Sequence, residues 1–232
     1  MVVWSYTHLP PFPYNDLYTT GMKKALLYVN GGLLDEKKLK NLLQATECII
    51  AVDGGANYLH TLHIMPDVLI GDMDSVDQEV FDLLKQKGTK IIVYPKSKDQ
   101  TDSELALSFA IEHGFQEICI VGFDGSRIDH MIATIHYLCK LVSKITIKII
   151  QNTDDIYFVT RSLTFSGKIN DEVSIIPLLS DAVGVTSTGL QYKLHDEKLS
   201  ILSTRGVSNV LSDSTAAISV RKGILMVVHR HL

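Results

Sequence analysis

Apolar and polar positions alternate in different ways before and after about residue 152 of this chain. In the first part, short apolar runs rich in Val and Ile alternate with longer segments whose apolar residues recur every three or four positions. Such runs are typical of buried strands, and such segments are typical of helices that cover a parallel sheet. The predicted strands are Ala25–Asn30, Cys48–Asp53, Val68–Asp72, Lys90–Pro95, Glu117–Gly122 and Ile145–Ile150.

Helix ends and helix faces can be located between these strands. Thr101 and Glu104 have the spacing of a capping box, which satisfies free backbone N–H groups, so we expect a helix from there to Gly114. Gly88 and Gly114 stand where a left-handed residue ends a helix. The apolar groups expected to face the sheet are Leu39, Leu42 and Leu43, then Val80, Phe81 and Leu84, and then Ile132, Ile135 and Cys139.

The helical spacing disappears after Asn152, where short β-rich runs are separated by Gly, Asp and Ser. The pattern therefore predicts an α/β protein with an N-terminal arm (residues 1–21), a parallel-sheet, Rossmann-like domain (residues 22–152) and a smaller all-β sandwich or barrel domain (residues 153–232). The strands expected in the last part are Asp155–Thr160, Val173–Leu178, Leu199–Leu202, Ala216–Val220 and Ile224–Val228.

Composition narrows the class of protein. Hydrophobic residues make up 46% of the 232 residues, and the net charge of -4 disfavours a protein that grips nucleic acid through a basic face. The three cysteines lie in apolar runs without a CxxC pair, which favours a cytoplasmic location. No apolar window approaches the length of a membrane-spanning helix, so no membrane partner is expected. His195, His229 and His231 are expected to be structural or exposed.

Glycines and aspartates follow four of the predicted strands. These turns are Asn30-Gly31-Gly32, Asp53-Gly54-Gly55, Gly71-Asp72-x-Asp74 and Gly122-x-Asp124-Gly125. Because ligands of open parallel sheets bind beyond the carboxyl ends of the strands, these residues are candidates for a site. The Asp72 and Asp74 carboxylates suit Mg²⁺, which prefers oxygen ligands, although a solvated acidic turn is the simpler alternative.

Two further clusters follow the fourth and fifth strands. Asp102 lies in the first turn of the capped helix, close to Asp99, and its convergence with Asp72 and Asp74 would call for a divalent cation. Arg127 offers a planar charged fork for phosphate oxygens, beside Asp129 and His130. Helix capping is the alternative explanation for Thr101, Asp102 and Asp129. No GxxxxGK[ST] or GxGxxG loop is present.

Taken together, these motifs resemble the thiamine pyrophosphokinase family. The matching residues are Asp53-Gly-Gly-Ala-Asn, Gly71-Asp72-x-Asp74-Ser75, Lys98-Asp99-x-Thr101-Asp102-x-Glu104 and Gly125-x-Arg127-x-Asp129-His130, with Ser208-Asn209 after Gly206. The resemblance implies that ATP and thiamine are converted into thiamine diphosphate and AMP, with Mg²⁺, by a homodimer whose thiamine sites lie between subunits. Ser126 and Val207 depart from the residues that are frequent in the family.

The resemblance also implies roles for individual residues. Asp72, Asp74 and Asp102 are the expected catalytic and metal-binding residues, and Arg127 is the fourth catalytic residue. Ser208 and Asn209 are expected to face thiamine. The residues expected to bind the nucleotide are Asn30, Gly31, Asp53, Gly54, Gly55, Asp99, Thr101, Asp129 and His130. A metal-dependent nucleotide hydrolase and a non-catalytic nucleotide or thiamine sensor are the alternative functions.

Overall fold

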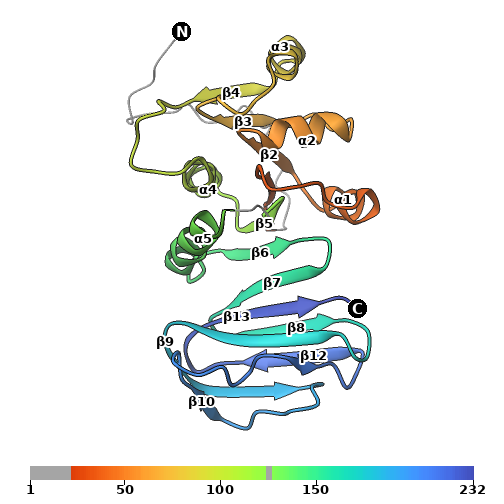
Figure 1. Cartoon of the computed structure of the whole chain (residues 1–232), viewed down its shortest axis with the longest axis vertical. Helices are drawn as coiled ribbons and strands as arrows, with labels where there is room; N and C mark the ends of the chain where they lie inside the picture. Colours follow the sequence, from red (N-terminus) through yellow and green to blue (C-terminus); the bar gives the residue numbers. More distant parts are fainter. Residues whose placement is uncertain (1–21, 124–126) are drawn as a thin grey trace. The chain divides into compact units, whose positions relative to one another are not determined.

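The computed structural model describes residues 22–123 and 127–232 and has a mixed α/β fold (Figure 1). The expected N-terminal arm and the Asp124-Gly125-Ser126 turn lie outside the described residues. The chain divides into two compact units, the first ending at Arg127 and the second beginning at Ile128. This division of contacts comes before residue 152, and the functional boundary expected at 152–153 stays a prediction.

The first unit contains a sheet of five parallel strands in the order β4-β3-β2-β1-β5. The strands are β1 (Lys24–Tyr28), β2 (Cys48–Val52), β3 (Val68–Gly71), β4 (Lys90–Val93) and β5 (Glu117–Val121). Every one coincides with a strand predicted from the sequence, and each ends one or two residues earlier than predicted. The residues left over, among them Asp53 and Asp72, belong to the turns that follow the strands.

Four helices cover this sheet, and Figure 1 shows α4 on the opposite side of the strands from α1, α2 and α3. They are α1 (Glu36–Leu43), α2 (Gly55–Thr61), α3 (Gln78–Lys87) and α4 (Asp102–Glu112). Leu39, Val80 and Leu84 are buried on the expected faces. The seven-residue helix α2 was not predicted. Its Ala56 and Leu59 are fully buried, so packing rather than helix propensity stabilises it.

The helix ends agree with the sequence. Thr101 is the N-cap of α4, and its hydroxyl accepts a hydrogen bond from the Glu104 N–H at 3.2 Å. The Glu104 carboxylate accepts a hydrogen bond from the Gln100 side chain at 3.2 Å, in place of the Thr101 backbone N–H that a capping box predicts. Gly88 and Gly114 follow α3 and α4 with φ angles of 87° and 79°, in the left-handed region that glycine adopts without strain.

The second unit begins with α5 (Ile128–Leu141), and its strands pair in the order β6-β7-β13-β9-β12-β8. All pairs from β6 onwards are antiparallel. The strands are β6 (Thr146–Ile150), β7 (Asp154–Val159), β8 (Ser162–Ser166), β9 (Glu172–Thr188), β12 (Thr215–Ser219) and β13 (Lys222–Arg230), while β10 (Glu197–Leu199) and β11 (Asn209–Val210) pair with β9. From residue 153 onwards the described elements are all strands.

Two sequence predictions in this unit are wrong in detail. The strand expected at Leu199–Leu202 ends at Leu199, because the N–H groups of Ile201 and Leu202 bond to the side chains of Asp181 and Ser200 instead of a neighbouring strand. Ile132, expected to face a sheet from α5, is half exposed. Among the described residues, no helix is both long and apolar enough to cross a membrane.

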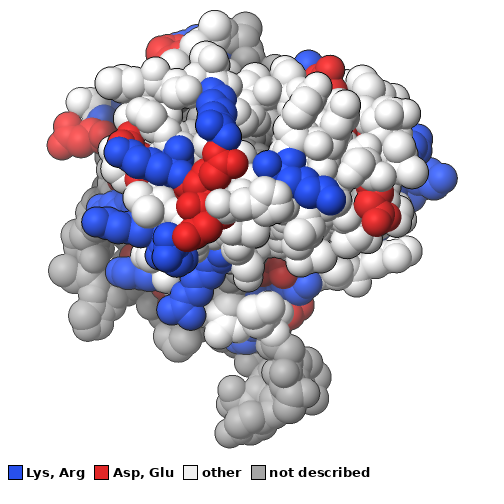
Figure 2. All heavy atoms as spheres, turned by 90° about the horizontal axis from the view of Figure 1, so that it is seen from below, with Lys and Arg blue, Asp and Glu red and all other residues white. Residues whose placement is uncertain are grey.

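The end of the second unit that carries β10 mixes both signs of charge. Figure 2 views this end and shows basic and acidic side chains next to one another. Lys198 lies 2.7 Å from Asp181, Arg221 lies 2.7 Å from Asp196, and Arg205 pairs with Glu197. Exposed ion pairs of this kind contribute little stability, so they are best explained as a solvated surface.

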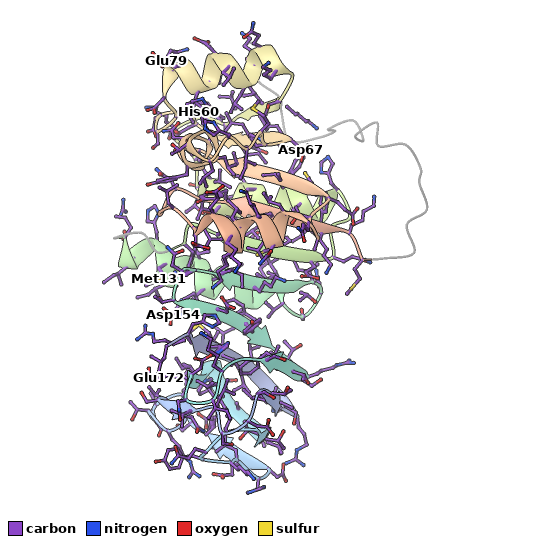
Figure 3. All side chains as sticks on the ribbon, turned by 90° about the vertical axis from the view of Figure 1, so that its right-hand side faces the viewer. His60, Asp67, Glu79, Met131, Asp154 and Glu172 are labelled. Atoms are coloured by element: carbon purple, nitrogen blue, oxygen red, sulfur yellow. The ribbon has the colours of Figure 1, made fainter. Side chains whose placement is uncertain are left out.

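Asp154 is a buried carboxylate at the start of β7 (Figure 3). Arg230 donates from Nε to Asp154 Oδ1 at 2.8 Å, and the Thr153 hydroxyl donates to Oδ2 at 2.7 Å. Burial alone would raise the pKa of Asp154, but these hydrogen bonds outweigh it and hold the pKa below its ordinary value. The ionised form is therefore favoured by folding.

We expect Asp154 to stabilise the fold above about pH 4, the ordinary range of an aspartate. This contribution is lost as the pH falls through the lowered pKa, because the folded state then has to bind the proton. Asp154→Asn should cost roughly 1–3 kcal/mol at neutral pH and should flatten the decline in acid. Urea denaturation at several pH values measures both effects. The exposed Asp213→Asn is the control, and an equal effect of the two changes would contradict the prediction.

Candidate functional site

The ends of β1, β2 and β3 bring polar turns to one edge of the sheet in the first unit. Asn30 follows β1, Asp53 follows β2 and Asp72 follows β3. The Asp53 N–H donates to the Ile70 carbonyl at 2.8 Å, so Asp53 is held beside the end of β3. Parallel pairing in register thus places aspartates that are distant in the chain next to each other.

Four aspartates, Asp53, Asp72, Asp74 and Asp102, form what we call the acidic centre. One carboxylate oxygen from each of Asp53, Asp72 and Asp74 lies within 4.8 Å of the others. The Asp74 N–H donates to Asp72 Oδ1 at 3.1 Å, which folds the turn back on itself. Asp53 and Met73 have φ angles of 48° and 67°, a costly region for residues with a side chain. Both turns therefore hold one residue in a strained backbone conformation at the acidic centre.

Two lysines offset the negative charge of the acidic centre. Lys98 Nζ lies 2.9 Å from Asp102 Oδ1 and 3.7 Å from Asp72 Oδ2, and all three side chains are largely buried. Lys96 Nζ lies 3.3 Å from Asp74 Oδ2 at a more exposed position. Sequence reasoning gave neither lysine a role in the site. The available signal was the position of Lys98 four residues before Asp102, across the start of α4.

The pKa values of two members of the acidic centre, Asp53 and Asp74, are shifted in opposite directions. Burial raises the pKa of Asp53, a hydrogen bond from Ser75 opposes the rise, and the nearby charges of Asp102, Asp72 and Asp74 add to it. Hydrogen bonds from Ser75 and then Lys96 lower the pKa of Asp74. The Oδ1 atom of Asp53 is buried without a hydrogen-bond partner.

These observations fit a divalent cation. Three carboxylates at mutual ligand distance, one with an unsatisfied buried oxygen, are a costly arrangement that a bound Mg²⁺ would relieve. Asp102 Oδ1 is also buried without a hydrogen bond, although Lys98 Nζ is only 2.9 Å away. The pair is therefore a close contact of charges whose geometry is not that of a hydrogen bond. The metal set predicted from the sequence was Asp72, Asp74 and Asp102, whereas the mutually close group contains Asp53 in place of Asp102.

Gly54 and Gly55 allow the start of α2 to approach β1. A Cβ atom on Gly55 would lie 2.1 Å from the Tyr28 carbonyl oxygen, and one on Gly54 would lie 2.5 Å from Asn30 Nδ2. Both distances are far below van der Waals contact. The turn after β2 and the turn after β1 therefore lie directly against each other, which is possible only because Gly54 and Gly55 have no side chain.

The turn after β1 is fixed by Tyr28, which is fully buried. The Tyr28 hydroxyl accepts a hydrogen bond from the Leu34 N–H at 3.0 Å and donates one to the Gly32 carbonyl at 3.1 Å. The Gly31 N–H donates to the Val29 carbonyl at 3.0 Å. Asn30 and Gly31 are thus held in one defined turn beside Gly54.

The remaining residues predicted to bind the nucleotide are less closely associated. The Thr101 hydroxyl caps α4, and Asp99 is exposed. Arg127 is exposed at the end of the first unit. Asp129 and His130 are exposed on α5 in the second unit, so no geometry relates them to the acidic centre.

Ser208 and Asn209, predicted to face thiamine, lie in the second unit. Asn209 is buried, and its side-chain amide accepts from the Tyr192 N–H at 3.0 Å and donates to the Tyr192 carbonyl at 2.7 Å. Asn209 Oδ1 also accepts from the Val210 N–H at 2.9 Å. Its amide therefore fixes the backbone around Tyr192, whose ring is exposed. Ser208 is exposed, with a left-handed φ of 57°.

Comparisons with known proteins match both parts of the chain. The family model described as "Thiamin pyrophosphokinase, catalytic domain" matches residues 39–150, and the model described as "Thiamin pyrophosphokinase, vitamin B1 binding domain" matches residues 162–225. The thiamine pyrophosphokinase of Bacillus subtilis is 32% identical over 182 residues, which cover 77% of this chain and 85% of the relative.

Solved structures agree with the sequence matches. The crystal structure of thiamine pyrophosphokinase from Bacillus subtilis superposes with a TM-score of 0.79 at 29% identity, covering 90% of this chain and all of the other. The thiamin pyrophosphokinase of Geobacillus thermodenitrificans superposes with a TM-score of 0.76 at 28% identity, covering 91% and 98%. Asp53, Asp72, Asp74 and Asp102 all fall within the span of the catalytic-domain match.

Proposed function

Because this chain belongs to the thiamine pyrophosphokinase family, we propose that it transfers the pyrophosphoryl group of ATP to the hydroxyl group of thiamine. The products are thiamine diphosphate and AMP. The observation that carries the proposal is the convergence of Asp53, Asp72 and Asp74 at one sheet edge, inside the span of the catalytic-domain match. A family likeness without such a site would support the fold alone.

We propose that Asp53, Asp72 and Asp74 hold Mg²⁺, with Asp102 beside them. The cation would supply positive charge against the phosphate oxygens of ATP. The unsatisfied oxygen of Asp53 supports this assignment, as does the group of three carboxylate oxygens within 4.8 Å of one another. Lys98 contacts both Asp72 and Asp102 and donates to the Pro95 carbonyl at 3.2 Å, so its ammonium group would be a cation close to the phosphate oxygens of a bound nucleotide.

The chain's own side chains position the reactants and compensate charge. The thiamine hydroxyl oxygen forms a bond to the β-phosphorus, and the bond from that phosphorus to the oxygen bridging to the α-phosphorus breaks, so this oxygen leaves with AMP. Arg127, Lys96 and Lys98 supply cations for the phosphate oxygens. Asp72 or Asp102 takes the hydroxyl proton. Catalysis of this kind depends on positioning and on electrostatic stabilisation more than on covalent chemistry.

We assign the nucleotide to the turns after β1 and β2 and to the start of α4. Asn30, Gly31, Gly54 and Gly55 are proposed to contact it, since the missing side chains of Gly54 and Gly55 let these two turns pack together at this edge of the sheet. The positive end of the α4 dipole, near Thr101 and Asp102, favours a bound anion. Asp99, Asp129 and His130 are proposed as further nucleotide contacts on the strength of the family motifs alone.

We propose that thiamine binds at Ser208 in the all-β region (residues 153–232), while the Rossmann-like region (residues 22–152) binds ATP. Asn209 would act on thiamine indirectly, by fixing Tyr192. Tyr192 and Val207 are 64% and 48% exposed, and this apolar surface next to Ser208 supports a homodimer in which a second subunit completes the site. The three buried free cysteines are consistent with a cytoplasmic location.

The test is to incubate the purified chain with ATP, Mg²⁺ and thiamine and to quantify both products by chromatography. We expect AMP to form only when thiamine is present, in equal amount to thiamine diphosphate. Phosphate release without thiamine would show a nucleotide hydrolase instead. Tight binding of ATP or thiamine without turnover would show a sensor. Either result would overturn the proposed function.

A further inference from the structure

A second group of potential metal ligands lies in the second unit. One nitrogen of His229, one nitrogen of His231 and one carboxylate oxygen of Asp155 lie within 4.8 Å of one another. His229 on β13 is paired directly with Asp155 on β7, so both side chains lie on the same face. His231 follows two residues later, and its N–H continues the pairing to the Thr153 carbonyl at 2.8 Å. The strand geometry thus brings all three side chains together.

Both histidines have a buried ring nitrogen that lacks a hydrogen bond. His229 Nε2 bonds to Asp171 Oδ2 at 2.9 Å, which leaves Nδ1 buried without a partner. His231 Nε2 is 3.0 Å from Asp155 Oδ2, yet the two atoms are not aligned as a hydrogen bond. Within residues 22–123 and 127–232, the only other buried side-chain atoms without hydrogen bonds are oxygens of Asp53 and Asp102 in the acidic centre.

Asp171 fixes the orientation of the His229 ring through its contact with Nε2. Its Oδ2 also accepts from the Lys168 N–H at 2.9 Å, and its Oδ1 accepts from the Leu232 N–H at 3.2 Å. Asp171 is 1% exposed, so its carboxylate is fixed on several sides. A histidine whose second nitrogen bonds to a fixed carboxylate is the usual arrangement of a metal-binding histidine.

The space around His229 is also limited by its neighbour Gly167. A Cβ atom at Gly167 would lie 2.6 Å from His229 Nε2. The ring and its bond to Asp171 therefore occupy the volume that any other residue at position 167 would fill. The two histidine rings lie with their centroids 4.3 Å apart, which keeps their nitrogens close enough to share one ion.

We propose that His229, His231 and Asp155 form a binding site for one divalent transition-metal ion of the zinc class. Imidazole nitrogens and a carboxylate suit Zn²⁺, whereas Mg²⁺ prefers oxygen ligands throughout, so this site and the acidic centre select different ions. The ion completes the bonding of both unsatisfied ring nitrogens. His231 is partly exposed, so water can fill a fourth position. A bound ion ties the C-terminal residues to β7 and stabilises the second unit.

A pair of ordinary histidine–aspartate ion pairs is the competing explanation. It accounts for the contact between His229 and Asp171, but it leaves His229 Nδ1 unsatisfied whatever the protonation state of the ring. It also predicts no response of the protein to zinc. The two explanations are therefore separated by metal binding itself.

The experiment uses the full chain, stripped with a chelator and returned to buffer with excess Mg²⁺. Zn²⁺ affinity is measured by competition with a chromophoric chelator, and Co²⁺ substitution reports nitrogen ligands through its d–d absorption. We expect one Zn²⁺ per chain and a rise in the melting temperature on zinc addition. His231→Gln should weaken zinc binding by about 100-fold or more, since loss of an orienting residue alone costs roughly 10–100-fold.

Two controls place the ion. The exposed His195→Gln should leave the zinc affinity and the Co²⁺ spectrum unchanged. Asp74→Asn should also leave both unchanged, because Asp74 belongs to the acidic centre and not to the proposed zinc site. Asp155→Asn provides a second variant of the site in case His231→Gln is poorly folded by circular dichroism. The proposal is wrong if zinc does not bind in excess Mg²⁺. It is also wrong if binding survives in folded His231→Gln and Asp155→Asn, or if it is lost in Asp74→Asn.

Discussion

Asp74→Asn is expected to lower turnover by roughly 10²–10³-fold while the protein stays folded. Asp74 belongs to the group of three carboxylates proposed to hold Mg²⁺, and asparagine removes one negative charge without changing the shape of the side chain. Its side chain is 44% exposed, so few other contacts depend on it. The rate of thiamine diphosphate formation, measured at increasing Mg²⁺ concentration, tests the prediction.

A role as metal ligand has a second signature. Part of the lost activity should return at high Mg²⁺ concentration, because the variant binds the ion more weakly. Asp82→Asn, at an exposed position on α3, is the matched control and should keep the original rate. Turnover of Asp74→Asn equal to that of the control would show that the acidic centre is not the reaction site.

Gly55→Ala should lower the free energy of unfolding by about 3 kcal/mol or more and should abolish most of the activity. The new Cβ atom would lie 2.1 Å from the Tyr28 carbonyl oxygen, an atom of the buried backbone of β1 that cannot move aside. Helix α2 would have to shift, and Asp53, two residues before Gly55, would shift with it. Urea denaturation followed by circular dichroism gives the loss of stability.

His60→Ala on the same helix is the control for Gly55→Ala. His60 is exposed, so its replacement should change stability by no more than about 0.5 kcal/mol. If Gly55→Ala were as stable as His60→Ala, the close packing of α2 on β1 would be wrong. Activity measured on the same samples shows whether the Asp53 turn depends on that packing.

The sequence predicts the first unit well because its sheet is parallel and buried. Each strand is then a short apolar run, and four of the five runs end at a turn rich in Gly or Asp. The carboxyl ends of parallel strands meet at one edge, so the sequence pattern alone predicts that Asp53 and Asp72 lie close together. The same reasoning located Thr101 as a cap, since capping follows from four adjacent residues.

Features that depend on distant residues could not be predicted in this way. Lys98 lies close to Asp72 only because the fold brings them together. Its spacing to Asp102 in the sequence does not predict that it contacts both aspartates. Helix α2 forms because Ala56 and Leu59 are buried, although its first residue is glycine. His229 and Asp155 are far apart in the chain, and only the pairing of β13 with β7 makes them neighbours. From the sequence, His229 and His231 were therefore expected only to be structural or exposed.

The contacts of Lys98 with Asp72 and Asp102 affect how the acidic centre balances its charge. The Lys98 ammonium group is a tethered counter-ion that balances part of the negative charge of Asp72 and Asp102. Lysine has a flexible stem, so its ammonium group can change position by rotation about the side-chain bonds. Under the proposed function, a bound cation would take a place beside an ammonium group that already balances two of the four aspartates.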